Sequence, residues 1–267
     1  MGIFSNNSNL LINQQNQVFN KKQLTIFSKS LLIAVLGFIA ICIISLISYF
    51  GVLKNYQNKG QTESLLIVML VMFFVSFIST MAWSWFTKLD GKSFVVWGYV
   101  AWISYVISQG IAFGAVYTLL SGGEIASIFS VAVAIYGSLA FIGARIKDKT
   151  AVTLSKILMW TMVLCFAFFF ISLIASVVIG LTIGVNSHVQ LFASMVGIAL
   201  FSVLILISVV LTFKHLFSVS EFTKLSDSSQ AKLIERRLIW LLGFNILAQF
   251  IALLWQIIRL YLIFGKR

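Results

Sequence analysis

The side chains that could do chemistry are concentrated in one apolar stretch near the C-terminus, NILAQFIALLWQIIR. Asn245, Gln249, Gln256 and Arg259 are set there among leucine, isoleucine, phenylalanine and tryptophan. At about 100° per residue, these four residues fall within an arc of about 80° around a helix. Because a polar stripe facing lipid is costly, we expect it to face the protein interior or a hydrated cavity.

Two interpretations of this stripe remain open. Amide side chains hydrogen-bond across membrane helices, so the stripe can act as a simple link between helices. In this reading Arg259 extends its guanidinium to the membrane surface. In the other reading the stripe lines a hydrated pathway or a gate.

Other chemistry has little support in the sequence. The acidic residues all lie outside the apolar stretches or at their edges; they are Glu63, Asp90, Glu124, Asp148, Glu221, Asp227 and Glu235. There is no nucleophile with a partnered base, no metal-ligand spacing and no phosphate-binding loop. The two cysteines, Cys42 and Cys165, lie in apolar stretches, where thiols behave as small hydrophobes. We therefore expect no enzymatic activity, no metal and no cofactor.

Composition decides the broad class. The chain is 60% hydrophobic and 10% charged, with a mean hydropathy of +1.04, whereas soluble domains carry about 25% charged residues. We therefore predict a polytopic membrane protein whose first partner is the lipid bilayer. The net charge of +12 is explained by basic loops on the cytoplasmic side of a membrane, so nucleic acid is not an expected partner.

The apolar stretches predict an all-α fold with seven transmembrane helices, since about 20 apolar residues cross about 30 Å of hydrocarbon. The spans are Leu31–Gly51, Leu65–Phe86, Phe94–Leu120, Ile125–Ala144, Ile157–Ile183, Val189–Phe213 and Leu238–Phe264. They make one membrane domain over residues 24–267. Residues 1–23 are rich in Asn and Gln, and their composition predicts a disordered tail. No secretory signal is evident, so the first span should be a retained anchor.

Basic residues alternate between the loops and so indicate the orientation. They precede the first span and occupy the connections between spans 2 and 3, 4 and 5, and 6 and 7. These residues are Lys21, Lys22, Lys29, Lys88, Lys92, Arg145, Lys147, Lys149, Lys156, Lys224, Lys232, Arg236 and Arg237. By the positive-inside rule the N-terminus is cytoplasmic. Seven full crossings would put Lys266 and Arg267 outside, so a seventh segment that turns back or does not fully cross stays open. The abundance of Lys, Asn and Ile suggests an AT-rich bacterial genome, hence a bacterial inner membrane.

Glycines mark places where helices can approach closely. Gly110 and Gly114 form a G-x-x-x-G motif in the third span, which allows close helix packing. Gly137 and Gly143 in the fourth span are assigned the same packing role. Ser121-Gly122-Gly123 is predicted to form a tight turn between these two spans.

Two segments together resemble the transmembrane Bax inhibitor motif family. The first runs from Gly110 to Gly143 and on into the basic loop, and the second is QFIALLWQIIR. The residues that carry the resemblance are Gly110, Gly123, Ile125, Phe129, Tyr136, Gly143, Lys147, Phe250, Ile251, Leu253 and Arg259. The resemblance implies six helices around a central seventh. It also implies a pH-sensitive calcium leak, gated by paired aspartates and an arginine.

The same resemblance keeps a second function open. Bacterial members of the family are linked to membrane-protease regulation and stress tolerance. The alternative is therefore a non-conducting regulatory protein that acts on other membrane proteins or on a membrane protease. Small cations are the expected partners in the first reading, and other membrane proteins in the second.

The chain departs from the family where the aspartates are expected. Gln249 stands at one aspartate position and Lys214 at the other, and the basic loop reads Lys147-Asp148-Lys149-Thr150 where the family has Lys-Arg-Asp-Leu. A glutamine does not titrate, and Lys214 repels a divalent cation. We therefore expect a divergent member in which hydrogen bonds of Asn245, Gln249 and Gln256 replace the aspartate latch. Arg259 and Lys214 complete the candidate ion path or gate.

Overall fold

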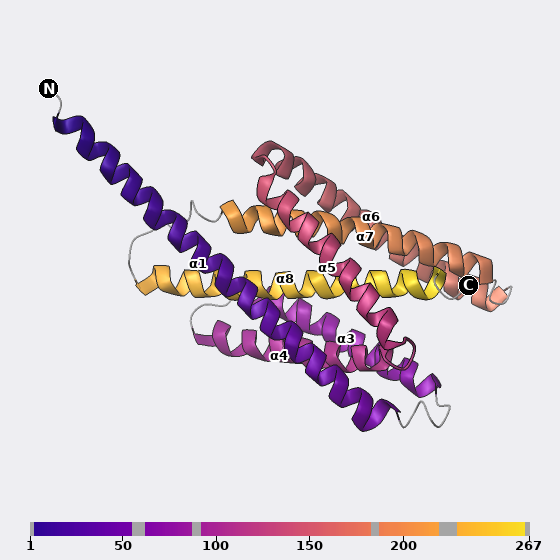
Figure 1. Cartoon of the computed structure of the whole chain (residues 1–267). Coiled ribbons are helices and arrows are strands. Elements are labelled where there is room, and N and C mark those ends of the chain that lie inside the picture. The colour runs from indigo at the N-terminus through magenta and orange to yellow at the C-terminus, as the bar shows by residue number, and fades with distance from the viewer. Residues whose placement is uncertain (1–2, 55–61, 87–91, 183–186, 219–228, 265–267) are drawn as a thin grey trace. The chain divides into compact units, whose positions relative to one another are not determined.

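The computed structural model describes residues 3–54, 62–86, 92–182, 187–218 and 229–264 (Figure 1). Within these ranges it contains seven α-helices and one short π-helix. They are α1 (Ile3–Ser48), η1 (Tyr49–Leu53), α3 (Thr62–Phe86), α4 (Lys92–Val116), α5 (Gly122–Arg145), α6 (Asp148–Thr182), α7 (Ser187–Ser218) and α8 (Ser229–Phe264). The prediction of an all-α fold is confirmed.

Five segments of the described chain are long and apolar enough to cross a membrane. They are Ile26–Gly51, Val96–Val116, Gly122–Arg145, Met195–His215 and Glu235–Phe264. A shorter apolar segment, Ile67–Trp83, lies within α3, and α6 contains residues 157–182 of the remaining predicted span. The chain is therefore a multi-pass helical membrane protein, and the number of seven crossings stays a prediction.

The helices are uninterrupted because the sequence offers nothing to break them. The chain contains no proline, and in hydrocarbon each backbone N–H and C=O has to be satisfied within its own helix. Hydroxyl groups inside the spans follow the same rule. Ser79 Oγ donates to Val75 O at 2.8 Å, and Thr161 Oγ1 donates to Ile157 O at 2.9 Å.

Helix α5 begins with a capping box at the predicted turn. The Ser121 N–H donates to Glu124 Oε2 at 2.6 Å, and the Glu124 N–H donates to Ser121 Oγ at 3.4 Å. This reciprocal pair satisfies two of the backbone donors that a helix N-terminus leaves free. Gly122 and Gly123 therefore belong to the first turn of α5, and the connection from α4 comprises residues 117–121.

Helix α1 reaches further toward the N-terminus than its apolar span. It begins at Ile3, so it includes most of the segment for which the composition predicts disorder. Extending an existing helix costs far less than nucleating one, because each added residue gains a hydrogen bond. The span that begins at Ile26 supplies that nucleus.

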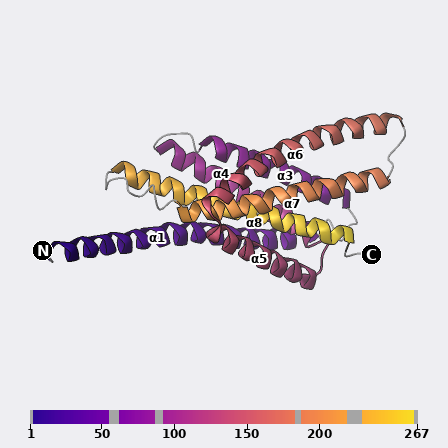
Figure 2. The same ribbon diagram turned by 90° about the horizontal axis from the view of Figure 1, so that it is seen from above.

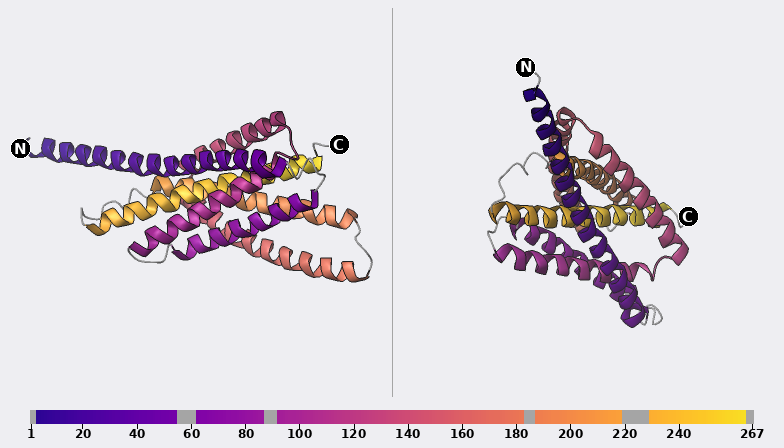
Figure 3. Two further views of the ribbon diagram at one scale, coloured as in Figure 1. Left: turned by 90° about the horizontal axis from the view of Figure 1, so that it is seen from below. Right: turned by 60° about the vertical axis from the view of Figure 1, so that its left-hand side comes forward.

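The contacts divide the chain into two compact units, and one membrane domain over residues 24–267 stays a prediction. The first unit comprises Met1–Ser127 and Val219–Leu247, and the second comprises Ile128–Ser218 and Ala248–Arg267. In the first unit, α4 packs against both α1 and α3 (Figures 1 and 3). In the second unit, α6 packs against α7 (Figure 2). Helices α5 and α8 each contribute to both units.

Glycines in the first unit let α1 and α4 come close together. A Cβ atom on Gly110 would lie 2.6 Å from Ile44 Cβ, and one on Gly114 would lie 2.9 Å from Ser45 O. Neither position has room for a side chain. The G-x-x-x-G motif is therefore the place where the two backbones meet, as expected of such motifs in membranes.

Candidate functional site

Gln249 joins two helices of the second unit at the middle of a membrane span. It lies at the midpoint of the Glu235–Phe264 segment and is partly buried. Its Nε2 donates to Ser208 Oγ at 2.7 Å and to Thr212 Oγ1 at 2.8 Å. Both hydroxyls belong to α7. We call Gln249, Ser208 and Thr212 the amide clamp, since together they hold α8 to α7.

The spacing of the two hydroxyls explains the clamp. Ser208 and Thr212 are four residues apart, so they lie on one face of α7, about 6 Å apart along its axis. A primary amide carries two N–H donors, one for each hydroxyl.

Gln249 Oε1 is buried and has no hydrogen-bond partner among the described residues. Exchanging the amide oxygen and nitrogen would leave the buried N–H groups unpaired instead. One end of this amide therefore lacks a partner among the described residues in either orientation.

A second orphan acceptor lies on the same face of α8. Gln256 is seven residues after Gln249, which places it within about 20° of the same direction and about 10 Å further along the axis. Its Oε1 is also buried, and no donor reaches it from the described part of the chain. A buried polar group without a partner costs about 1–3 kcal/mol. Two such oxygens in a row are a feature that apolar packing alone does not explain.

The other members of the predicted stripe lie in different surroundings. Asn245 is partly buried and belongs to the first unit. Arg259 is exposed. Ten residues separate Arg259 from Gln249, or about 15 Å along the helix, which is half the hydrocarbon thickness. Arg259 therefore lies near the membrane surface, where its guanidinium reaches water and headgroups.

Lys214 makes an ion pair at the end of the second unit that holds the basic loop. Its Nζ lies 2.7 Å from Asp148 Oδ1, and the side chains of Lys214 and Asp148 are 18% and 90% exposed. The pair ties the last turns of α7 to the start of α6. Gln249 bonds to hydroxyls and Lys214 to a carboxylate, so these two predicted site residues have different partners.

The aromatic residues that carry the family resemblance form a cluster in the second unit. Phe250 makes edge-to-face contacts with Phe129 at 5.9 Å and Tyr136 at 5.4 Å between ring centroids. Tyr136 contacts Phe213 in the same way at 5.7 Å. Phe213 follows Thr212 in sequence and Phe250 follows Gln249, so the cluster packs beside the amide clamp.

The two glycines of α5 differ sharply. A Cβ on Gly143 would lie 2.5 Å from Val210 O and 2.9 Å from Phe213 Cβ, so α5 and α7 meet there backbone to backbone. Gly137 is exposed, and a Cβ on it would meet nothing within 4 Å. Of the two, Gly143 occupies a close helix contact and Gly137 does not.

Sequence reasoning missed the partners of the stripe. Ser208 and Thr212 are two hydroxyls at i and i+4 in the otherwise apolar stretch of residues 203–213, and this spacing is the signal in the sequence. The sequence shows Asp148 only as part of the basic loop, and its proximity to Lys214 depends on how α6 and α7 pair. Among the residues that the structure describes, no three His, Cys, Asp or Glu side chains come together as metal ligands. The second unit offers neutral amide and hydroxyl oxygens instead.

The chain matches no protein-family model, no curated protein and no solved structure.

The clamp should contribute measurably to the stability of the second unit. Interhelical hydrogen bonds in membranes are worth about 0.6 kcal/mol each, so Gln249→Leu should cost about 1 kcal/mol. The same loss should follow from Ser208→Ala with Thr212→Ala, and combining all three changes should add little. Thermal unfolding in detergent measures this coupling. The matched control is Ser138→Ala, because Ser138 Oγ donates to Ala134 O of its own helix at 2.8 Å. Strictly additive losses would show that the clamp does not act as a unit.

Proposed function

We propose that this protein is a leak channel for small cations and a divergent relative of the transmembrane Bax inhibitor motif family. The observation that carries the proposal is the pair of buried oxygens, Gln249 Oε1 and Gln256 Oε1, without donors in the described part of the chain. They follow one another on one face of α8, from the middle of its apolar segment toward its C-terminal end. Carbonyl oxygens arranged along a pore are the ligands that replace the hydration shell of a permeating cation.

The proposed architecture is a central α8 surrounded by the other six helices, with the N-terminus in the cytoplasm of a bacterial cell. Half of the most apolar stretch of α8 is buried, against 56% for α4 and 17% for α5, so α8 is one of the two most enclosed candidate spans. The aromatic cluster gives further support, because its four residues include positions that carry the family resemblance. The orientation rests on the alternation of basic loops.

In the proposed mechanism the amide clamp is the closed gate. While Gln249 Nε2 bonds to Ser208 and Thr212, α8 is fixed against α7. Opening exchanges these bonds for water, and the freed hydroxyls join Gln249 Oε1 and Gln256 Oε1 as neutral ligands. Divalent cations prefer carboxylates, so this ligand set favours monovalent cations over calcium. The clamp contains no titratable group, so the leak should not depend on pH between mild acid and neutrality.

Flux into liposomes tests the proposal. We expect purified protein to admit potassium or sodium into dye-loaded vesicles at equal rates at neutral and mildly acidic pH, and calcium more slowly. Gln256→Leu removes one of the two oxygens and should lower the flux, because the cation loses one ligand along its path. Ser138→Ala, outside the stripe, should leave the flux unchanged. Absence of flux of any of the three ions, at either pH, contradicts the channel.

The same clamp favours a second candidate function. Both N–H groups of Gln249 are used, as expected of a fixed link between helices in a non-conducting protein. Such a protein would regulate other membrane proteins or a membrane protease through contacts within the bilayer. Labelling separates the two candidates. In a chain with Cys42 and Cys165 replaced by serine, a cysteine substituted for Gln256 should react with a water-soluble thiol reagent in a channel, and stay unreactive in a dry bundle.

A further inference from the structure

Helix α6 is much longer than the membrane requires. Its 35 residues extend about 52 Å, against about 30 Å of hydrocarbon. Its polar end is the N-terminal one, which carries Asp148, Lys149 and Lys156. The first turns of α6 must therefore lie in the headgroup layer and not in the hydrocarbon.

Three residues on one face of α6 mark the passage from headgroups to hydrocarbon. Lys149, Lys156 and Trp160 fall within about 40° of one another around the helix, and all three are exposed. Lys156 lies about 10 Å beyond Lys149 along the axis, and Trp160 lies about 6 Å further. Trp160 is 64% exposed, and exposed tryptophan is typical of the membrane interface.

The surroundings of Lys156 show what its ammonium group has to meet. Its neighbours Val152, Ile157 and Met159 are 58%, 44% and 58% exposed. Such apolar surface on a membrane helix faces acyl chains, so the Lys156 side chain lies along lipid and extends toward the headgroups. The counter-charge within its reach is then a lipid phosphate.

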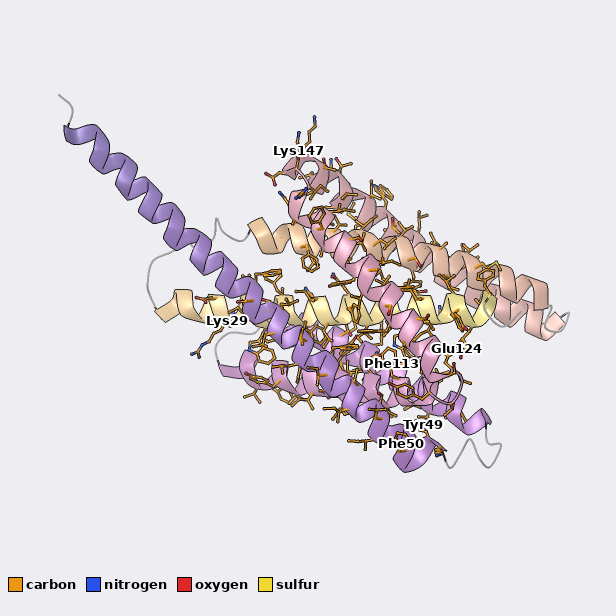
Figure 4. The ribbon with its side chains drawn as sticks, in the orientation of Figure 1. Lys29, Tyr49, Phe50, Phe113, Glu124 and Lys147 are labelled. Carbon is orange, nitrogen blue, oxygen red and sulfur yellow. The ribbon has the colours of Figure 1, made fainter. Side chains whose placement is uncertain are left out.

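The nearest acidic residue in the sequence, Asp148, does not compete with a lipid phosphate for these lysines. Between Arg145 and Lys156 the sequence contains a single acidic residue, Asp148, and Lys214 holds it at 2.7 Å. Lys147, Lys149 and Lys156 have no carboxylate partner among the described residues. Figure 4 shows Lys147 at the turn between α5 and α6, with other nitrogen-tipped side chains around it. Arg145 adds a further positive charge, with its guanidinium 4.0 Å from the centre of the Phe141 ring.

We infer that the lipid-facing side of α6 binds the headgroup of an anionic phospholipid. Lys149 and Lys156 hold the phosphate between them, and Trp160 packs at the level where the acyl chains begin. Lys147 and Arg145 strengthen the positive field. An exposed apolar flank on both sides of Lys156 requires acyl chains next to the phosphate, which distinguishes a lipid from free phosphate. This site is independent of ion conduction along α8.

Quenching of Trp160 by brominated lipid tests the inference. The full chain is placed in nanodiscs that contain either brominated phosphatidylglycerol or brominated phosphatidylcholine at the same mole fraction. The chain has seven tryptophans, so the signal of Trp160 is obtained by subtracting the signal of Trp160→Phe. We expect preferential quenching by phosphatidylglycerol in the wild-type chain. Each lysine lost should reduce that preference about fivefold, from its attraction to an anionic surface.

Matched variants separate a site from general surface charge. Lys149→Gln with Lys156→Gln should abolish the preference, and Lys149→Arg with Lys156→Arg should restore it. Lys29→Gln with Lys54→Gln removes the same charge from the first unit and should leave the preference intact. The inference is overturned by equal quenching by both lipids, by a preference that survives the double Gln variant, or by an equal loss in the control. Competition by inorganic phosphate would also overturn it, because it would assign the site to a soluble anion.

Discussion

Replacing Gly143 with alanine should destabilise the second unit, whereas the same change at Gly137 should not. The new Cβ at position 143 would lie 2.5 Å from the Val210 carbonyl oxygen, so α5 and α7 have to move apart. Overpacking of this kind costs about 1–3 kcal/mol, and the upper end applies because the obstacle is backbone. Thermal unfolding in detergent should show a melting temperature lower by several degrees, and Gly143→Leu should prevent recovery of folded protein.

Gly137 is the matched control for this prediction, because it lies on the same helix and is open to its surroundings. Alanine forms helices better than glycine by about 1 kcal/mol, so Gly137→Ala should be neutral or slightly stabilising. The two changes therefore have opposite signs. Equal melting temperatures for Gly137→Ala and Gly143→Ala would show that α5 and α7 do not meet at Gly143.

These two glycines also illustrate what the sequence could predict about the fold. Each of the seven predicted spans overlaps a helix of the described chain. A chain segment in hydrocarbon has to form a helix, and a helix that crosses the membrane requires a long apolar stretch in the sequence. Both glycines lie in one such stretch and look alike in sequence. Their difference arises from a carbonyl of α7, more than 60 residues away, which no local pattern reports.

The candidate site, like the fold, could be predicted from the sequence only in part. The polar stripe on α8 follows from helical periodicity, which fixes the direction of each side chain relative to its own helix. The partners of Gln249 depend on the rotation and register of α7 against α8, which periodicity within one helix does not determine. Lys214 is instructive for the same reason. The resemblance implies a place for it in the ion path, whereas the fold gives it Asp148 as a partner.

Gln249→Asp should make the cation leak depend on pH. A protonated aspartic acid at this position can still donate to one hydroxyl of the clamp and accept from the other, so the gate stays closed. Once ionised, it becomes an acceptor only and places a full negative charge at mid-membrane. At an effective dielectric constant of about 20, that charge attracts a monovalent cation 4 Å away by about 4 kcal/mol. The cation should then be drawn into the path, where it competes with the two hydroxyls for the carboxylate oxygens.

The expected result is flux that rises about tenfold from mildly acidic to neutral pH, because desolvation of the carboxylate offsets part of the attraction. Dye-loaded liposomes with the variant, assayed at both pH values, give the measurement. Gln249→Asn is the matched control, since asparagine has the shape of aspartate and does not titrate. Its flux should be the same at both pH values. Identical pH profiles for the Asp and Asn variants, or an Asp variant whose flux falls as the pH rises, would remove Gln249 from the ion path and leave the clamp as a structural link between α7 and α8.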